Sequence, residues 1–166
     1  GLLYFGVWGA SLFALCAGRG QGFGAIAGLV MALGICWAGD TFAYFVGRAI
    51  GKHKLCPALS PGKTVEGAIG ALVATTAFSI WWGPKFMGME LVPSIAIGLL
   101  LGVAGILGDL LESVLKRWAG VKDSSNLLPG HGGILDRMDS LFLVAPILQA
   151  ALVALRDSGG SKPVAG

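Results

Sequence analysis

Residues 91–115 read LVPSIAIGLLLGVAGILGDLLESVL, and this stretch decides the fold class. The run is apolar along most of its length, and its charged residues, Asp109 and Glu112, both lie near its end. A helix that crosses the hydrocarbon core of a bilayer needs about 20 consecutive, mostly apolar residues. The length and composition of this stretch therefore predict a transmembrane helix.

The composition of the whole chain agrees with a membrane protein. Of 166 residues, 55% are hydrophobic and 13% are charged, and the 28 glycines come in addition. A soluble domain is typically about 45–50% apolar with glycine included, and about 25% charged. These values exclude a water-soluble globule and a disordered linker. The glycines show no three-residue period, which excludes collagen.

Four further apolar segments flank this one, at residues 2–17, 23–46, 65–82 and 140–155. We therefore expect an all-α polytopic membrane protein of about five transmembrane helices with polar cytoplasmic loops, in which residues 1–166 form a single membrane-embedded domain. The polar, glycine-rich residues 157–166 are expected to be a flexible tail.

The basic residues lie in alternate loops. One group is Arg48, Lys52, Lys54 and Lys63, and the other is Lys116, Arg117, Lys122 and Arg137. By the positive-inside rule, both loops face the cytoplasm. The N-terminus is then cytoplasmic and the C-terminus lies outside.

Polar residues at helical spacing mark one face of the predicted helix at 91–115. At offsets of three, four and seven they are Asp109, Glu112, Ser113 and Lys116. A carboxylate at membrane depth costs at least about 2.5–3.5 kcal/mol on insertion scales. A structural ion pair with Lys116 or Arg117 is one interpretation, and a functional polar site is the favoured one. Asp40, near the end of the segment at 23–46, is interpreted in the same way.

Two more carboxylates, Asp136 and Asp139, stand three residues apart just before the last apolar segment. Asp136 alone could be a helix N-cap, which leaves Asp139 unexplained. Three acidic groups from two helices suit Mg²⁺, which is usually held by one or two carboxylates and substrate phosphates. The sequence therefore predicts a magnesium site at Asp109, Asp136 and Asp139.

The loop between these helices combines basic side chains with glycines. It contains Lys116, Arg117, Lys122, Asp123, His131, Gly132 and Gly133. Cationic side chains and accessible backbone amides both donate to polyphosphate oxygens. The basic residues could instead only fix orientation or attract anionic lipids, and His131 could be an ordinary loop residue.

The other basic loop contains SPGKTVEG at residues 60–67. Ser60 as N-cap and Pro61 at the first helical position predict that a helix begins there. Its N-terminus with Lys63 could bind an anion, or the feature could be capping alone. Glycines at spacings of three or four are predicted to serve helix packing; they are Gly67, Gly70, Gly98, Gly102 and Gly105.

The motif SVLKRWAGVKDSSNLLPGHGGILDRMD at residues 113–139 resembles the signature of phosphatidate cytidylyltransferases, also called CDP-diacylglycerol synthases. The residues at the family spacing are Ser113, Lys116, Arg117, Lys122, Asp123, His131, Gly132, Gly133, Asp136, Arg137 and Asp139. WAGDTFAYFVGRAIGKHKL at residues 37–55 and SPGKTVEG also look like this family. Gly62 and Val65 depart from the family, which usually has Lys and Trp there. Members carry further N-terminal spans, so we expect a C-terminal catalytic portion.

The resemblance implies that CTP and phosphatidic acid give CDP-diacylglycerol and pyrophosphate, with Mg²⁺ as cofactor and a monovalent cation such as K⁺ left open beside it. It implies a homodimer in a bilayer, with no nucleic acid partner, in a bacterial inner membrane with the active site facing the cytoplasm. The implied catalytic residues are Asp109, Lys122, Asp123, Asp136 and Asp139. The implied substrate-binding residues are Ser60, Lys63, Ser113, Lys116, Arg117, Lys122, His131, Gly132, Gly133 and Arg137.

Two alternatives stay open at this point. A CTP-dependent polyprenol or lipid kinase would transfer the γ-phosphoryl group and release CDP. A cation transporter would use Asp40, Asp109 and Glu112 as an intramembrane relay, and it would leave the basic, glycine-rich loop unexplained.

Overall fold

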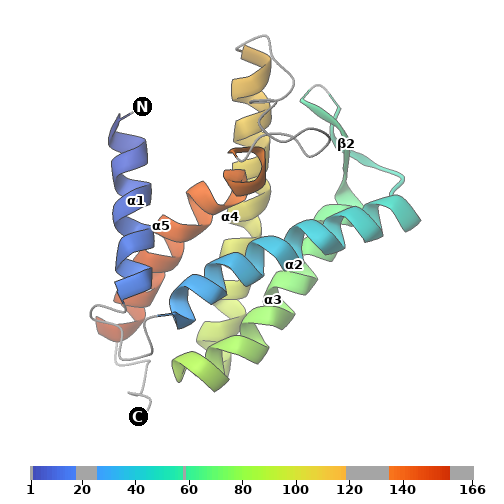
Figure 1. The fold of residues 1–166 in the computed structure, drawn as a ribbon. Coiled ribbons are helices and arrows are strands. Elements are labelled where there is room, and N and C mark those ends of the chain that lie inside the picture. Colours follow the sequence, from blue (N-terminus) through green and yellow to red (C-terminus); the bar gives the residue numbers. More distant parts are fainter. Residues whose placement is uncertain (1, 18–25, 58, 119–134, 158–166) are drawn as a thin grey trace.

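The computed structural model describes residues 2–17, 26–57, 59–118 and 135–157. For some residues inside the helices, among them 116 and 135–139, it describes the backbone alone. The described chain forms, in order, α1 (Leu2–Ala17), α2 (Ala27–Ile50), β1 (Lys54–Cys56), β2 (Ser60–Thr64), α3 (Val65–Met87), α4 (Leu91–Trp118) and α5 (Leu135–Asp157). Figure 1 shows α2 and α3 running alongside each other, with α5 between α1 and the other helices.

The helices confirm an all-α polytopic membrane protein. Within the described residues, three helices are long and apolar enough to cross a membrane, at Ala27–Ile50, Val65–Met87 and Leu91–Leu115. The two outer segments predicted from the sequence also form helices, α1 and α5. Helix α1 has 16 residues, and α5 contains a shorter apolar stretch, Leu143–Leu155.

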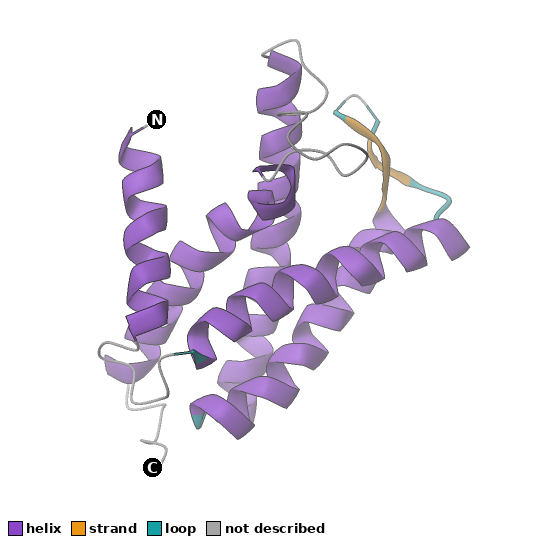
Figure 2. Cartoon of the chain, viewed as in Figure 1, coloured by secondary structure: helices purple, strands orange, loops and turns teal. Residues whose placement is uncertain are grey.

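The segment between α2 and α3 folds as a β-hairpin, which is an addition to the predicted helices (Figure 2). Strands β1 and β2 are antiparallel, with Lys54 opposite Thr64 and Cys56 opposite Ser60. Because β2 has more residues than β1 between these two pairs, the ladder contains an irregularity of the β-bulge type. The prediction that a helix begins at Pro61 after a Ser60 cap was therefore wrong.

The helix begins four residues later, and Thr64 is its N-cap. The Thr64 side chain accepts a hydrogen bond from the Gly67 backbone N–H at 3.1 Å, and the Val65 N–H donates to the His53 carbonyl at 2.9 Å. Thr64 satisfies one backbone donor of the first turn, and His53, the residue before β1, satisfies another. Ser and Pro residues occur in several kinds of turn as well as at helix starts. The pairing of β2 with β1 decides that residues 60–64 form a strand here.

Close approach of the helices depends on glycine. A Cβ atom added to Gly67 would lie 2.7 Å from the Ala43 carbonyl oxygen of α2, and one added to Gly98 would lie 2.6 Å from the Thr76 Cα of α3. These distances confirm the packing role predicted for both, and Gly70 and Gly102 are similarly crowded. Gly105 differs, because its added Cβ would have Val144 Cγ2 as its nearest described neighbour, at 3.9 Å.

The core lies where α2, α4 and α5 meet. Its fully buried side chains include Met31, Ile35, Leu101, Val144 and Leu148. Large apolar side chains such as Trp37, Phe45 and Val92 are exposed on the outside. An apolar exterior around a packed interior is typical of a protein whose solvent is lipid.

We expect Thr64→Val to destabilise the protein by about 0.5–2 kcal/mol, because it keeps the shape of the side chain and removes the capping oxygen. Thr64→Ser retains the oxygen and is expected to be milder. The measurement is thermal unfolding in detergent. Ser60→Ala is the control and should have little effect; an equal loss in Ser60→Ala and Thr64→Val would contradict the assignment of Thr64 as the cap.

Candidate functional site

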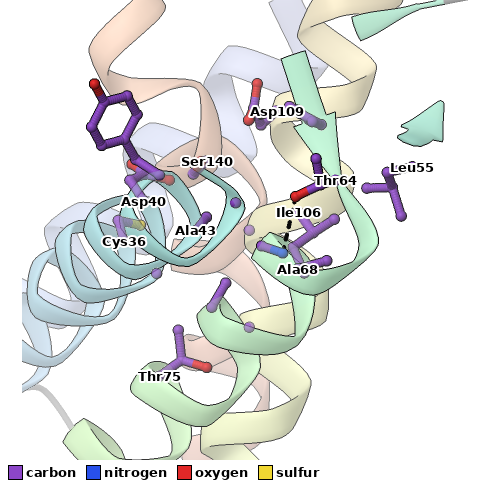
Figure 3. Close-up of a pocket in the computed structure, with 18 of the residues that line it drawn as sticks. Cys36, Asp40, Ala43, Leu55, Thr64, Ala68, Thr75, Ile106, Asp109 and Ser140 are labelled. Carbon is purple, nitrogen blue, oxygen red and sulfur yellow. Dashed lines mark hydrogen bonds and ion pairs between the residues drawn. The ribbon is translucent and has the colours of Figure 1, made fainter. Parts of the chain in front are cut away.

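A cavity of about 620 Å³ lies among the helices and the hairpin. Its lining residues come from α2, α3, α4, α5 and both strands (Figure 3). Pockets for small molecules typically measure about 300–1,000 Å³. The cavity is therefore large enough to hold a lipid head group or a nucleotide phosphate chain.

Polar side chains from four elements line the cavity: Asp40 of α2, Lys63 of β2, Asp109 of α4 and Ser140 of α5. Figure 3 shows Asp40, Asp109 and Ser140 around the same space. We call these four residues, of which Ser140 alone is uncharged, the charged layer. Asp40 and Asp109, both interpreted from the sequence as functional carboxylates, thus share one cavity.

Lys63 and Asp109 form an ion pair that joins the hairpin to α4, with 2.5 Å between Nζ and Oδ2. The Lys63 Nζ atom is buried, and Asp109 is the opposite charge that the described chain places beside it. Removing an ammonium group from water is costly unless an opposite charge compensates. The sequence placed Lys63 and Asp109 in separate roles, and the structure brings them into contact.

A second contact secures the base of the hairpin. The Glu66 Oε1 atom lies 2.7 Å from His53 Nδ1 and accepts the His53 backbone N–H at 3.2 Å. This contact ties the segment after α2 to the first turn of α3, on either side of the strands that carry Lys63. Sequence reasoning missed His53, because a lone histidine in a basic loop carries no spacing signal.

Sequence reasoning also missed Arg48 as part of the site, where it lies beside Tyr44. Both line the cavity, and Arg48 Nη1 donates to the Tyr44 hydroxyl at 2.8 Å. Their offset of four residues places them on one face of α2, and Asp40 stands one further turn back. From the sequence, Arg48 was used only to predict the membrane topology. Its position eight residues after Asp40 nevertheless places both on one face of a helix.

Other predicted residues of the described chain lie away from the cavity lining. The Ser113 hydroxyl donates to the Asp109 backbone carbonyl at 2.9 Å, on its own helix. Ser60 is half-buried at the start of β2, and Arg117 is exposed near the end of α4. Both carboxylate oxygens of Glu112 are buried. The binding roles of Ser60, Ser113 and Arg117 stay predictions.

The remaining predicted residues fall outside the described side chains. Asp136, Arg137 and Asp139 belong to the first turns of α5, for which the backbone is described, and the side chain of Lys116 is likewise not described. Residues outside the described ranges are Lys122, Asp123, His131, Gly132 and Gly133. Among the side chains that are described, no cluster of three or more metal-ligating residues occurs. The magnesium site therefore stays a prediction.

The helical register nevertheless relates α5 to the cavity. Ser140 and Val144 are four residues apart and both line it. Asp136 stands four residues before Ser140, so it occupies the same face of the helix, one turn further toward the N-terminus of α5.

Comparison with known proteins identifies a family. The model of a family described as "Cytidylyltransferase family" matches residues 1–155. The phosphatidate cytidylyltransferase of Bacillus subtilis (strain 168) is 50% identical over 118 residues, which cover 69% of this chain and 43% of that protein. The enzyme of the same name from Staphylococcus saprophyticus is 45% identical over 133 residues, covering 76% of this chain and 49% of that protein. The chain spans about half the length of these curated relatives.

The ion pair in the cavity makes a prediction about coupling. Lys63→Met and Asp109→Asn are each expected to lower the melting temperature in metal-free detergent buffer, and the double variant should melt above the value expected from the two single changes. Because the side chains are 23% and 37% exposed, we expect a coupling of about 1 kcal/mol or less. Lys54→Met, an exposed lysine on the same hairpin, is the control and should combine additively with Asp109→Asn. Additive effects for Lys63→Met as well would contradict the pair.

Proposed function

This chain belongs to the cytidylyltransferase family, and on that premise we propose that it is the catalytic part of an enzyme that transfers the cytidylyl group of CTP to phosphatidic acid, giving CDP-diacylglycerol and pyrophosphate. The observation that carries the proposal is the cavity itself. It lies among apolar helices and has charged side chains, Lys63, Asp109 and Asp40, with apolar residues such as Leu101 and Val144 elsewhere on its wall. A lipid phosphate is a charged group attached to an apolar body, and such a cavity suits both parts.

The reaction needs positioning and charge compensation more than a strong base. An oxygen of the lipid phosphate attacks the α-phosphorus of CTP, and the bond from that phosphorus to the oxygen bridging to the β-phosphate breaks as pyrophosphate leaves. A phosphate monoester has a second pKa of about 6, so the nucleophile is largely ionised near neutral pH. The barrier is then the approach of one anion to another, which cationic groups lower.

The residues around the cavity have the donor chemistry that Mg²⁺ prefers. Asp40 and Asp109 supply carboxylate oxygens from two helices, and the ion pair of Asp109 with Lys63 places this carboxylate beside a positive charge. Asp109, Asp136 and Asp139 would hold the ion, which would supply charge compensation for the phosphates. The register of Asp136 with the cavity-lining Ser140 supports its inclusion. A monovalent cation such as K⁺ could share these carboxylates.

The basic residues divide between the two substrates in this proposal. Lys63 already lies in the cavity and would bind the phosphate of the lipid, with Ser60 nearby on the same strand. The CTP phosphates would be bound by Lys116, Arg117, Lys122, His131 and Arg137, with Ser113, Gly132 and Gly133 beside them and Asp123 orienting Lys122. Electrostatic binding of this kind is general for polyphosphates.

The chain is part of an integral membrane protein, and its relatives are bacterial. We propose that it resides in a bacterial inner membrane as a homodimer, without a nucleic acid partner, with the cavity reached from the cytoplasm. Three basic residues of the hairpin region, Lys52, Lys54 and Lys63, lie at the end of the helices where the charged layer is found. The positive-inside rule supports a cytoplasmic location for that end, where CTP is available.

Position-specific labels distinguish the proposed reaction from its alternatives. With the protein in phosphatidate-containing liposomes and Mg²⁺, label from the α-phosphate of CTP should enter the lipid, and label from the γ-phosphate should leave as pyrophosphate. A CTP-dependent kinase would instead put the γ-label into a lipid alcohol and release CDP. Transfer of γ-label to lipid, or cation flux without nucleotide, would overturn the proposal.

The metal assignment predicts that Asp136→Asn and Asp139→Asn each lower turnover by about 100-fold or more, because removing a group that stabilises transition-state charge has effects of that order. Asn is as good an N-cap as Asp, so a capping role predicts almost no change. Turnover against Mg²⁺ concentration is the measurement, with melting in detergent as the check on folding. Asp157→Asn, at the exposed end of the same helix, is the control. Normal turnover with unchanged Mg²⁺ dependence would refute the assignment.

A further inference from the structure

The cavity has a second layer, one helical turn from the charged layer and further from the hairpin. Gly105 stands four residues before Asp109 on α4, Val144 four residues after Ser140 on α5, and Cys36 four residues before Asp40 on α2. All six residues line the cavity. Four residues of helix span about 6 Å. The second layer is thus a set of small or apolar groups about 6 Å from the charged one.

Among the described residues, nothing in the packing around Gly105 requires that this member of the layer lack a side chain. An added Cβ at Gly47 would lie 2.9 Å from Thr64 Oγ1, and one at Gly67 would lie 2.7 Å from the Ala43 carbonyl oxygen, so these lining glycines permit helix contact. At Gly105 the nearest described atom would be Val144 Cγ2, at the ordinary contact distance of 3.9 Å. Glycine inside a helix is less stable than alanine by roughly 0.5–1 kcal/mol. At position 105 it leaves unfilled a part of the cavity in which Val144 Cγ2 is the one described atom within 4 Å of an added Cβ.

The chemistry around Gly105 favours an apolar occupant. Val144 and Leu101 are fully buried side chains of the cavity wall, and Ile106 is next to Gly105. The Thr75 hydroxyl, also in the wall, donates to the Leu72 carbonyl of its own helix at 3.1 Å. A cytosine ring needs hydrogen-bond partners for its amine and carbonyl, whereas the glycerol carbons and acyl chains of a lipid do not.

We propose that Gly105 is a specificity-determining position that keeps room for the glycerol backbone and the first part of the acyl chains when the lipid phosphate lies in the charged layer. The inference rests on the proposed function, because it assumes a diacyl lipid phosphate as substrate. The part of the cavity beside Gly105 then receives the diacyl portion of the lipid, and a larger side chain at position 105, which would project into the cavity, excludes the diacyl form before slimmer lipids.

Gly105→Leu tests this directly in the liposome-reconstituted protein. We expect kcat/KM for diacyl phosphatidate to fall by about 10-fold or more and that for monoacyl lysophosphatidate by less than about 3-fold, with the KM for CTP unchanged, since steric misplacement acts on the lipid alone. Gly105→Ala should be intermediate. Gly9→Leu on α1, where an added Cβ has no described atom within 4 Å, is the matched control and should change none of these values.

A labelling experiment reports on lipid occupancy without catalysis. In a variant with Cys16, Cys36 and Cys56 replaced by alanine, Gly105→Cys should react with a small maleimide, and phosphatidate in the liposomes should slow the reaction several-fold without CTP. Inorganic phosphate should not protect. Protection by phosphate alone, or by CTP alone, would overturn the inference, as would equal losses of kcat/KM for the two lipids in Gly105→Leu.

The two experiments separate failure of this inference from failure of the proposed function. A wild-type protein that forms no CDP-lipid while phosphatidate still protects position 105 would refute the proposed reaction and retain the lipid site. Normal CDP-lipid formation with an unprotected position 105 would refute the inference alone. Melting in detergent shows whether Gly105→Leu folds, and the protection assay with Gly105→Cys covers the case in which it does not.

Discussion

A carboxylate carried by an apolar helix must be compensated by a positive charge, and in this chain Lys63 provides that charge for Asp109. Asp109 belongs to α4, one of the helices long enough to span a membrane, and Lys63 belongs to a short strand of the hairpin. Their contact holds the end of β2 that joins α3 against α4 and defines one side of the cavity. A phosphate-bearing substrate would use the positive charge of Lys63, and a metal ion would use the negative charge of Asp109.

The hairpin can bring Lys63 to α4 because its two ends are held. Thr64 caps the first turn of α3, and Glu66 in that turn binds the backbone and the imidazole of His53 before β1. If the helix began at Pro61, Lys63 would belong to α3 itself. The extended backbone of β2 therefore determines which residue meets Asp109.

Glycine serves two purposes in this protein, and they differ in what lies opposite each residue. At Gly67 and Gly98 an added Cβ would collide with the backbone of a neighbouring helix, so glycine allows the helices to approach. At Gly105 the space opposite belongs to the cavity. Close packing on one part of a helix and open volume on another together shape a site among helices that are otherwise uniformly apolar.

The sequence by itself determined the membrane class, the helices and the family. Helix α1 covers the predicted residues 2–17, and α4 begins at the predicted Leu91, because apolar runs of sufficient length form helices in lipid whatever surrounds them. The motif at residues 113–139 indicated the cytidylyltransferase family. The tertiary structure alone decided that residues 60–64 form a strand, that Lys63 meets Asp109, and that Gly105 faces a cavity. Each of these depends on what another part of the chain places nearby, and local residue preferences do not contain that information.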